Sequence, residues 1–251
     1  MKIDYSDFSK SLPEFGPTAD KLATSANQSL LALGLILLGL FFLLELMSWN
    51  QHMKSRGNGL TKKLWLEIGF KYLVAFVLIV YSAPILDGLG WILNGAIRLA
   101  LKGVQMVNPA DLEYKFEIGG VKGWIKNVII LVGQGTEAVA NVVVYIVNFL
   151  RYLELYVLKA IAPVLIACFM SDTLRSVTIN FFKTYASYFI LALLMTLVSI
   201  IYPAMITDDL LKLAMPDANA TQLAFMSIAK GIIYIMAIVG TGRKAKQLLG
   251  V

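Results

Sequence analysis

Residues that usually carry out chemistry in proteins are scarce in this sequence. It has one histidine, His52, and one cysteine, Cys168, which excludes a histidine metal site, a cysteine zinc cluster and a disulfide framework within one chain. His52 lies in a basic stretch, and Cys168 lies inside an apolar run. No serine–histidine–aspartate set and no pair of catalytic carboxylates is recognisable. We therefore expect no enzyme activity, no metal and no cofactor.

Polar residues interrupt the apolar stretch 127–150, among them Gln134, Glu137 and Asn141. Polar residues inside membrane segments usually face the protein or a water-filled cavity rather than lipid. One interpretation is that this face lines a translocation path or contacts another subunit. The alternative is an ordinary membrane span whose polar face packs on neighbouring helices.

A lysine, Lys230, lies near the middle of the apolar stretch 222–240. On insertion scales a lysine at the centre of a span costs about 2.5–3.5 kcal/mol, so its charge should not face lipid. Its flexible side chain could reach the membrane surface instead. We expect an inward-facing charge that pairs with Glu137 or, failing that, with Glu154.

The composition is that of a membrane protein. The chain has 251 residues, of which 58% are hydrophobic and only 15% charged, whereas soluble domains carry about 25% charge. The mean hydropathy is +0.73. Several stretches of about 20 residues have almost no charge, enough for a helix to cross a hydrocarbon core about 30 Å thick. We predict an all-α, polytopic membrane protein rather than a soluble enzyme, a disulfide scaffold or a β-barrel.

The predicted membrane domain covers 28–240, between an amino-terminal segment, 1–27, and a basic tail, 241–251. Pro84 and Asp87-Gly88 should kink the second span or end it early. The triplet that starts at Asn27 fits the N-glycosylation pattern, but it lies too close to a span and is interpreted as chance. Five apolar stretches are predicted to cross: 28–47, 72–93, 153–170, 185–206 and 222–240.

Charge in the connections indicates the orientation, since lysine and arginine favour the cytoplasmic side. Residues 48–71 carry five basic residues against one acid, and the tail carries three against none. Residues 207–221 carry three aspartates against one lysine. These biases predict an amino terminus outside and a cytoplasmic carboxyl terminus, hence an odd number of crossings. Five crossings fit if 127–150 lies along, or dips into, the outer leaflet.

The stretch from 158 to 198 has a recognisable order of features. An apolar helix opens at an alanine–proline pair, a polar turn with threonine and arginine follows, then come an aromatic amphipathic helix and a long apolar helix. The residues that carry this order are Ala162, Pro163, Thr173, Arg175, Phe181 and Phe182. Asp172-Thr173 suits a helix N-cap. Either this region is a helix hairpin on the inner leaflet, or it is a docking site for other proteins.

This order resembles the hallmark of the TrbL-like family, polytopic inner-membrane subunits of conjugative type IV secretion systems. The chain departs from that pattern in having Phe181-Phe182 where a tryptophan is common, and in lacking a large carboxyl-terminal domain. The resemblance implies a bacterial inner-membrane channel or platform component that helps DNA–protein substrate across the membrane. It also implies a homo-oligomer in membrane lipid that contacts other secretion subunits, including the ATPases. A self-contained small-solute transporter is the alternative.

Overall fold

The computed structural model describes residues 5–55, 62–104, 124–207 and 219–251. Throughout these ranges the regular structure is helical and no strand occurs. Four of the described helices are long and apolar enough to cross a membrane, and a bent pair of helices can supply a fifth crossing. The prediction of an all-α fold with about five spans is confirmed.

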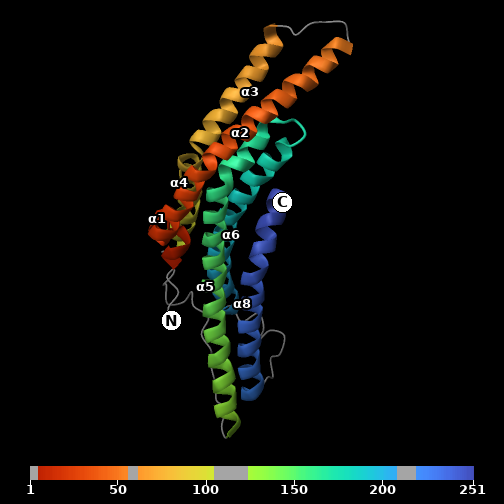
Figure 1. Ribbon diagram of the computed structural model, residues 1–251. Helices are drawn as coiled ribbons and strands as arrows, with labels where there is room; N and C mark the ends of the chain where they lie inside the picture. The colour runs from red at the N-terminus through yellow and green to blue at the C-terminus, as the bar shows by residue number, and fades with distance from the viewer. Residues whose placement is uncertain (1–4, 56–61, 105–123, 208–218) are drawn as a thin grey trace. The chain divides into compact units, whose positions relative to one another are not determined.

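The helices follow one another along the chain as Figure 1 labels them. In order they are η1 (Tyr5–Ser9), α1 (Leu12–Phe15), α2 (Pro17–Ser55), α3 (Lys62–Val80), α4 (Ser82–Val104), α5 (Trp124–Ala167), η3 (Cys168–Met170), α6 (Arg175–Thr207) and α8 (Ala220–Leu249).

The chain divides into two compact units. Unit 1 consists of Met1–Lys10, Asn94–Arg151 and Tyr188–Leu248, and unit 2 consists of Ser11–Leu93, Tyr152–Ser187 and Leu249–Val251. Helices α4, α5 and α6 contribute residues to both units. The core of each unit is therefore made by segments that are distant in the sequence.

Helix α2 contains the predicted span 28–47 and extends beyond it at both ends. Its 39 residues correspond to about 58 Å of helix, roughly twice the thickness of a hydrocarbon core. Large apolar side chains such as Leu33, Ile36, Leu40 and Leu43 are exposed along it. A helix that is apolar all round suits a surrounding of lipid or other helices.

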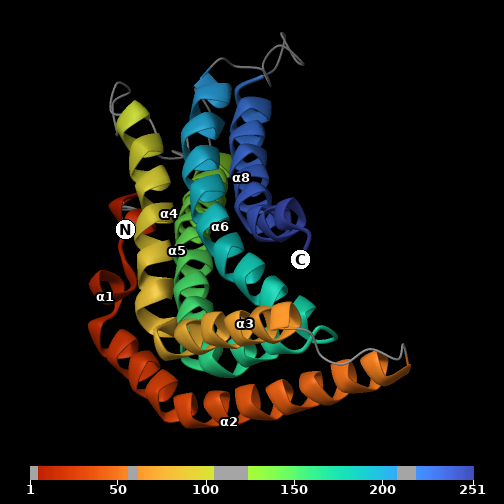
Figure 2. The same ribbon diagram turned by 90° about the horizontal axis from the view of Figure 1, so that it is seen from above.

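The stretch 72–93 is not one straight helix. Helices α3 and α4 meet at Tyr81 with a bend of 77°, which Figure 2 shows from above. Pro84 causes it, since its ring would clash with the carbonyl four residues earlier, at Val80, where α3 ends. The predicted kink is present, but Asp87-Gly88 does not interrupt a helix and lies inside α4.

Helix α5 corrects two expectations. It runs without a break over 44 residues, about 66 Å, so 127–150 and most of 153–170, up to Ala167, belong to one helix. The stretch 127–150 is therefore not a segment separate from the next helix, and its position relative to the membrane stays a prediction. Pro163 does not open a helix either, since it lies four residues before the end of α5.

Helix α6 merges what the sequence suggested as two helices. The aromatic amphipathic stretch and the apolar span 185–206 form one helix of 33 residues. In unit 1, α8 lies beside the second half of α6, where the Ser199 and Tyr234 hydroxyls are 3.1 Å apart. Helix α8 ends at Leu249, and the φ of 65° at the following Gly250 is the left-handed conformation that glycine adopts after helix ends.

Candidate functional site

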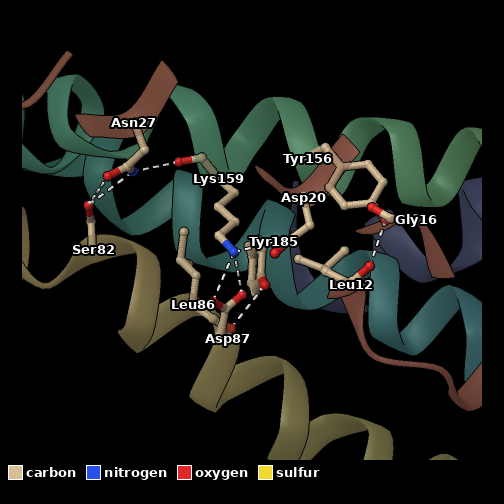
Figure 3. A network of polar contacts seen from close by, with 10 residues as sticks. All are labelled: Leu12, Gly16, Asp20, Asn27, Ser82, Leu86, Asp87, Tyr156, Lys159 and Tyr185. Carbon is tan, nitrogen blue, oxygen red and sulfur yellow. Dashed lines mark hydrogen bonds and ion pairs between the residues drawn. The ribbon is translucent and has the colours of Figure 1, made fainter. Parts of the chain in front are cut away.

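Unit 2 contains a lysine that is buried together with two carboxylates. Lys159 of α5 is 1% exposed. Its Nζ donates to Asp20 Oδ1 at 2.8 Å and to both carboxylate oxygens of Asp87 at 2.8 and 2.9 Å (Figure 3). Three donors are all that an ammonium group has, so this lysine is fully satisfied. We call Lys159, Asp20 and Asp87 the ionic cluster.

The ionic cluster connects three helices. Asp20 lies in the first turn of α2, where a negative charge also favours the positive end of the helix dipole. Asp87 lies in α4 and Lys159 in α5. The Lys159 side chain is 1% exposed and that of Asp20 14%, whereas the Asp87 side chain is 39% exposed. A charge buried this deeply is tolerated only when it is paired and hydrogen-bonded.

A second polar contact joins the same three helices. The Asn27 amide donates to the backbone carbonyl of Lys159 at 2.7 Å and lies 3.1 Å from the Ser82 hydroxyl (Figure 3). That carbonyl needs a donor because the residue four positions later, Pro163, has no N–H. Asn27 is only 3% exposed, so its side chain is engaged in packing, which agrees with interpreting its glycosylation pattern as chance.

Close contact between α2 and α5 depends on a glycine. A Cβ built on Gly34 would lie 2.7 Å from the carbonyl oxygen of Pro163 and 3.1 Å from its Cβ. Those distances are shorter than any ordinary contact, so only a residue without a side chain fits there. The Ala162-Pro163 pair of the motif therefore serves helix packing in this structure, with Ala162 fully buried.

Two tyrosine hydroxyls donate hydrogen bonds to backbone carbonyls close to the ionic cluster (Figure 3). Tyr156 donates to the carbonyl of Leu12 at 2.8 Å, and Tyr185 donates to the carbonyl of Leu86 at 2.9 Å. The Phe15 ring stacks on Tyr152 at 3.7 Å between centroids. Helix α1 is thereby fixed to α5, and α4 to α6.

The remaining motif residues lie around the start of α6. Phe181 is buried at 3% exposure and meets Phe182 edge-on, with the ring centroids 5.1 Å apart. Thr173 and Arg175 are exposed, and the Arg175 guanidinium lies 5.1 Å from the centre of the Phe169 ring. Among these motif residues, Phe181 is thus part of the core, whereas Thr173 and Arg175 lie on the surface.

Helix α6 begins at Arg175, so the residue directly before it is Leu174 rather than one of the expected pair Asp172-Thr173. The Asp172 carboxylate pairs with Lys71 of α3 at 2.5 Å, and Lys71 also lies 3.6 Å from Glu45 of α2. The hydrogen bond from Lys71 lowers the pKa of the Asp172 carboxyl. This ion pair connects the polar turn before α6 to α3.

The polar residues suspected of lining a path are distributed over both units. Gln134, Glu137 and Asn141 lie on the unit 1 part of α5, the first exposed and the others half-buried. Lys230 is half-buried in unit 1, and its backbone carbonyl accepts a hydrogen bond from Tyr202. Glu154 is exposed and belongs to unit 2. The pair between Lys230 and Glu137 stays a prediction.

The ionic cluster is what the sequence interpretation missed. Lys159 and Asp87 both lie inside apolar stretches, where an ionisable residue is unusual. The reasoning applied to Lys230, that a charge inside an apolar stretch should not face lipid, would have identified Lys159 and Asp87 as well. It could not have named Asp20 as the third member, because that residue lies in a polar stretch 139 positions from Lys159. In the described part of the chain, no group of three or more His, Cys, Asp or Glu residues could hold a metal.

Long apolar helices, with ionisable residues paired inside the fold, define a multi-pass helical membrane protein. Comparison with family models identifies it further. Residues 86–244 match the model described as TrbL/VirB6 plasmid conjugal transfer protein, and the chain belongs to this family. The match covers more than half of the chain and includes Asp87, Lys159 and the motif. No curated protein and no solved structure matches the chain.

As a member of this family, the protein is a component of conjugal transfer that associates with other type IV secretion subunits. The family consists of structural components rather than enzymes. The suspected resemblance to the TrbL-like family is confirmed.

Proposed function

We propose that this protein is an inner-membrane channel or platform component that helps DNA–protein substrate cross the membrane. It acts as a homo-oligomer in contact with the secretion ATPases and hydrolyses nothing itself. The observation that carries this proposal is the family match over 86–244. The substrate path follows the polar face of α5 at Gln134, Glu137 and Asn141.

The geometry of α5 supports this choice of face. Gln134, Glu137 and Asn141 are spaced by three and four residues, so they follow one side of an α-helix. Exposed apolar side chains follow another side of the same stretch, including Val132, Val139 and Val142. A helix with polar residues on one side and exposed apolar residues on another suits a position between a water-filled path and other protein or lipid.

Charge reversal at Glu137 and Lys230 tests the path and the proposed pair together. We expect each single reversal, Glu137→Lys or Lys230→Glu, to lower conjugal transfer by about tenfold or more, because like charges then face each other in a low dielectric. The double reversal should recover part of the loss. Mating frequency is the measurement, and immunoblotting of membranes shows whether each variant is inserted. Losses that simply add in the double variant would remove the pair.

The control for this experiment is Glu137→Leu, which removes the charge without introducing repulsion. If the carboxylate serves the path, this variant inserts normally but transfers poorly. Normal transfer by Glu137→Leu would remove the functional role of Glu137, and normal transfer in a strain lacking the protein would remove the proposed function altogether.

The orientation is testable by cysteine labelling in a Cys168→Ser background. The charge bias of the connections predicts that Asp217→Cys is outside and Arg56→Cys is cytoplasmic; both positions lie outside the described residues. An impermeant maleimide added to intact cells should label position 217 and leave position 56 unlabelled until the cells are opened. The reverse pattern contradicts the proposed orientation.

A further inference from the structure

The outward side of helix α8 changes from apolar to basic within one turn. Ile232, Met236 and Val239 are exposed along this side. Arg243, also exposed, follows about one turn after Val239 and two turns after Met236, so these residues lie on the same side of the helix. Val239 and Arg243 are about 6 Å apart along the helix axis. A helix that faces lipid shows such a change where the acyl chains end and the polar headgroups begin.

The opposite side of α8 is buried against the rest of unit 1. Tyr234, Ile238 and Ala245 are at most 2% exposed, and the Tyr234 hydroxyl contacts Ser199 of α6. The side that carries Arg243 is therefore turned away from α6 and is open to the surroundings of the protein.

The basic residues at this end of α8 are not neutralised by neighbouring acids. Arg243 and Lys244 are exposed, and neither side chain forms a hydrogen bond or an ion pair with another described residue. Lys246 Nζ lies 5.5 Å from the centre of the Tyr188 ring of α6. Neither α6 nor α8 contains an aspartate or a glutamate. The end of α8 thus presents uncompensated positive charge directly beyond an apolar surface.

Space for a ligand is left between the apolar and the basic part. A Cβ built on Gly240 or on Gly242 would have nothing within 4 Å, and Gly240 is exposed. No described side chain therefore covers the helix at the level between Val239 and Lys244. A headgroup can approach the helix there while its acyl chain lies along the apolar side.

We propose that this end of α8 binds an anionic phospholipid, with its phosphate at Arg243 and Lys244 and an acyl chain along Val239 and Met236. The charge selects the lipid class, because the ammonium of a zwitterionic headgroup would be repelled by the same cations. Each basic residue near an anionic lipid surface contributes about a factor of five in affinity. The apolar surface below the cations favours a lipid over a soluble anion. This inference does not depend on the proposed channel role.

Site-specific photo-crosslinking tests the binding. Full-length protein with p-benzoylphenylalanine in place of Met236 is placed in nanodiscs of equal parts phosphatidylglycerol and phosphatidylcholine, and mass spectrometry counts the adducts after illumination. Phosphatidylglycerol adducts should exceed phosphatidylcholine adducts at least about fivefold. The double variant Arg243→Gln with Lys244→Gln should bring the ratio close to one. Equal adducts without these two substitutions overturn the proposal, and so does cross-linking to a second copy in place of lipid.

Three matched controls separate a site from a general attraction. Exchanging the two cations, Arg243→Lys with Lys244→Arg, keeps the charge and should keep the preference. Lys126→Gln, which removes an exposed lysine of α5, should also keep it. With the photoreactive residue in place of Ile36, which is 68% exposed on α2, both lipids should react equally, and a preference as strong as at Met236 overturns a local site. Both leaflets have the same composition, so the result is independent of orientation, and mating frequency reports the transfer role separately.

Discussion

Replacing Lys159 by methionine is expected to destabilise the protein by about 3 kcal/mol. Removal of one partner from a buried ion pair costs about 3–5 kcal/mol, because it leaves uncompensated charge behind. The lower end applies here, since the Asp87 side chain is 39% exposed and is only partly desolvated by the surrounding protein. Asp20, at 14% exposure, has no such relief. Reversible unfolding in mixed detergent micelles measures the change.

The same argument predicts a rescue. Combining Lys159→Met with Asp20→Asn and Asp87→Asn removes every charge of the ionic cluster, and apolar or neutral replacements of a whole buried cluster are often tolerated. The triple variant should therefore be clearly more stable than Lys159→Met alone. Lys183→Met, an exposed lysine on α6, is the control and should change stability by less than about 0.5 kcal/mol. Equal stability of Lys159→Met and the control would contradict a structural role for the cluster.

Gly34→Ala is expected to destabilise the protein by about 1–3 kcal/mol, the usual cost of forcing extra atoms into a packed interior. The added methyl would lie 2.7 Å from the Pro163 carbonyl oxygen and 2.9 Å from its carbonyl carbon. Both atoms belong to the backbone of α5, so the helices themselves would have to move apart. Such a movement also separates Asn27 from the carbonyl of Lys159. Thermal unfolding in detergent, followed by circular dichroism, measures the effect.

The matched control is Gly39→Ala in the same helix. Nothing lies within 4 Å of a Cβ built on Gly39. The same substitution should therefore be neutral there or stabilising by up to about 1 kcal/mol, because alanine favours helix over glycine. If both variants unfold at the same temperature, the close contact between α2 and α5 does not limit stability.

Most of the helices could be predicted from the sequence because their signal is local. Long apolar runs without charge indicate a membrane helix from their own residues alone. Pro84 interrupts a helix because its ring clashes with a carbonyl of that same helix. The motif from Ala162 to Phe182 is local in the same sense, and it led to the correct family.

The continuity of α5 could not be predicted in this way. Polar residues such as Gln134 and Glu137, and Pro163 further on, suggested interruptions, since each weakens a membrane helix taken alone. In the folded protein the missing donor of Pro163 is replaced by the Asn27 amide on another helix. An interruption that a distant residue compensates has no local signature.

The sequence by itself determined the class of this protein, its apolar stretches, its charge asymmetry and its family, because composition, period and motif are properties of neighbouring residues. Only the tertiary structure decided which polar residues meet. Lys159 finds Asp20 and Asp87 at separations of 139 and 72 residues, and Arg151 finds the carbonyl of Phe8 at a separation of 143. A buried charge requires a partner wherever the fold can supply one, so the sequence shows the requirement and the packing of the helices chooses the residue that meets it.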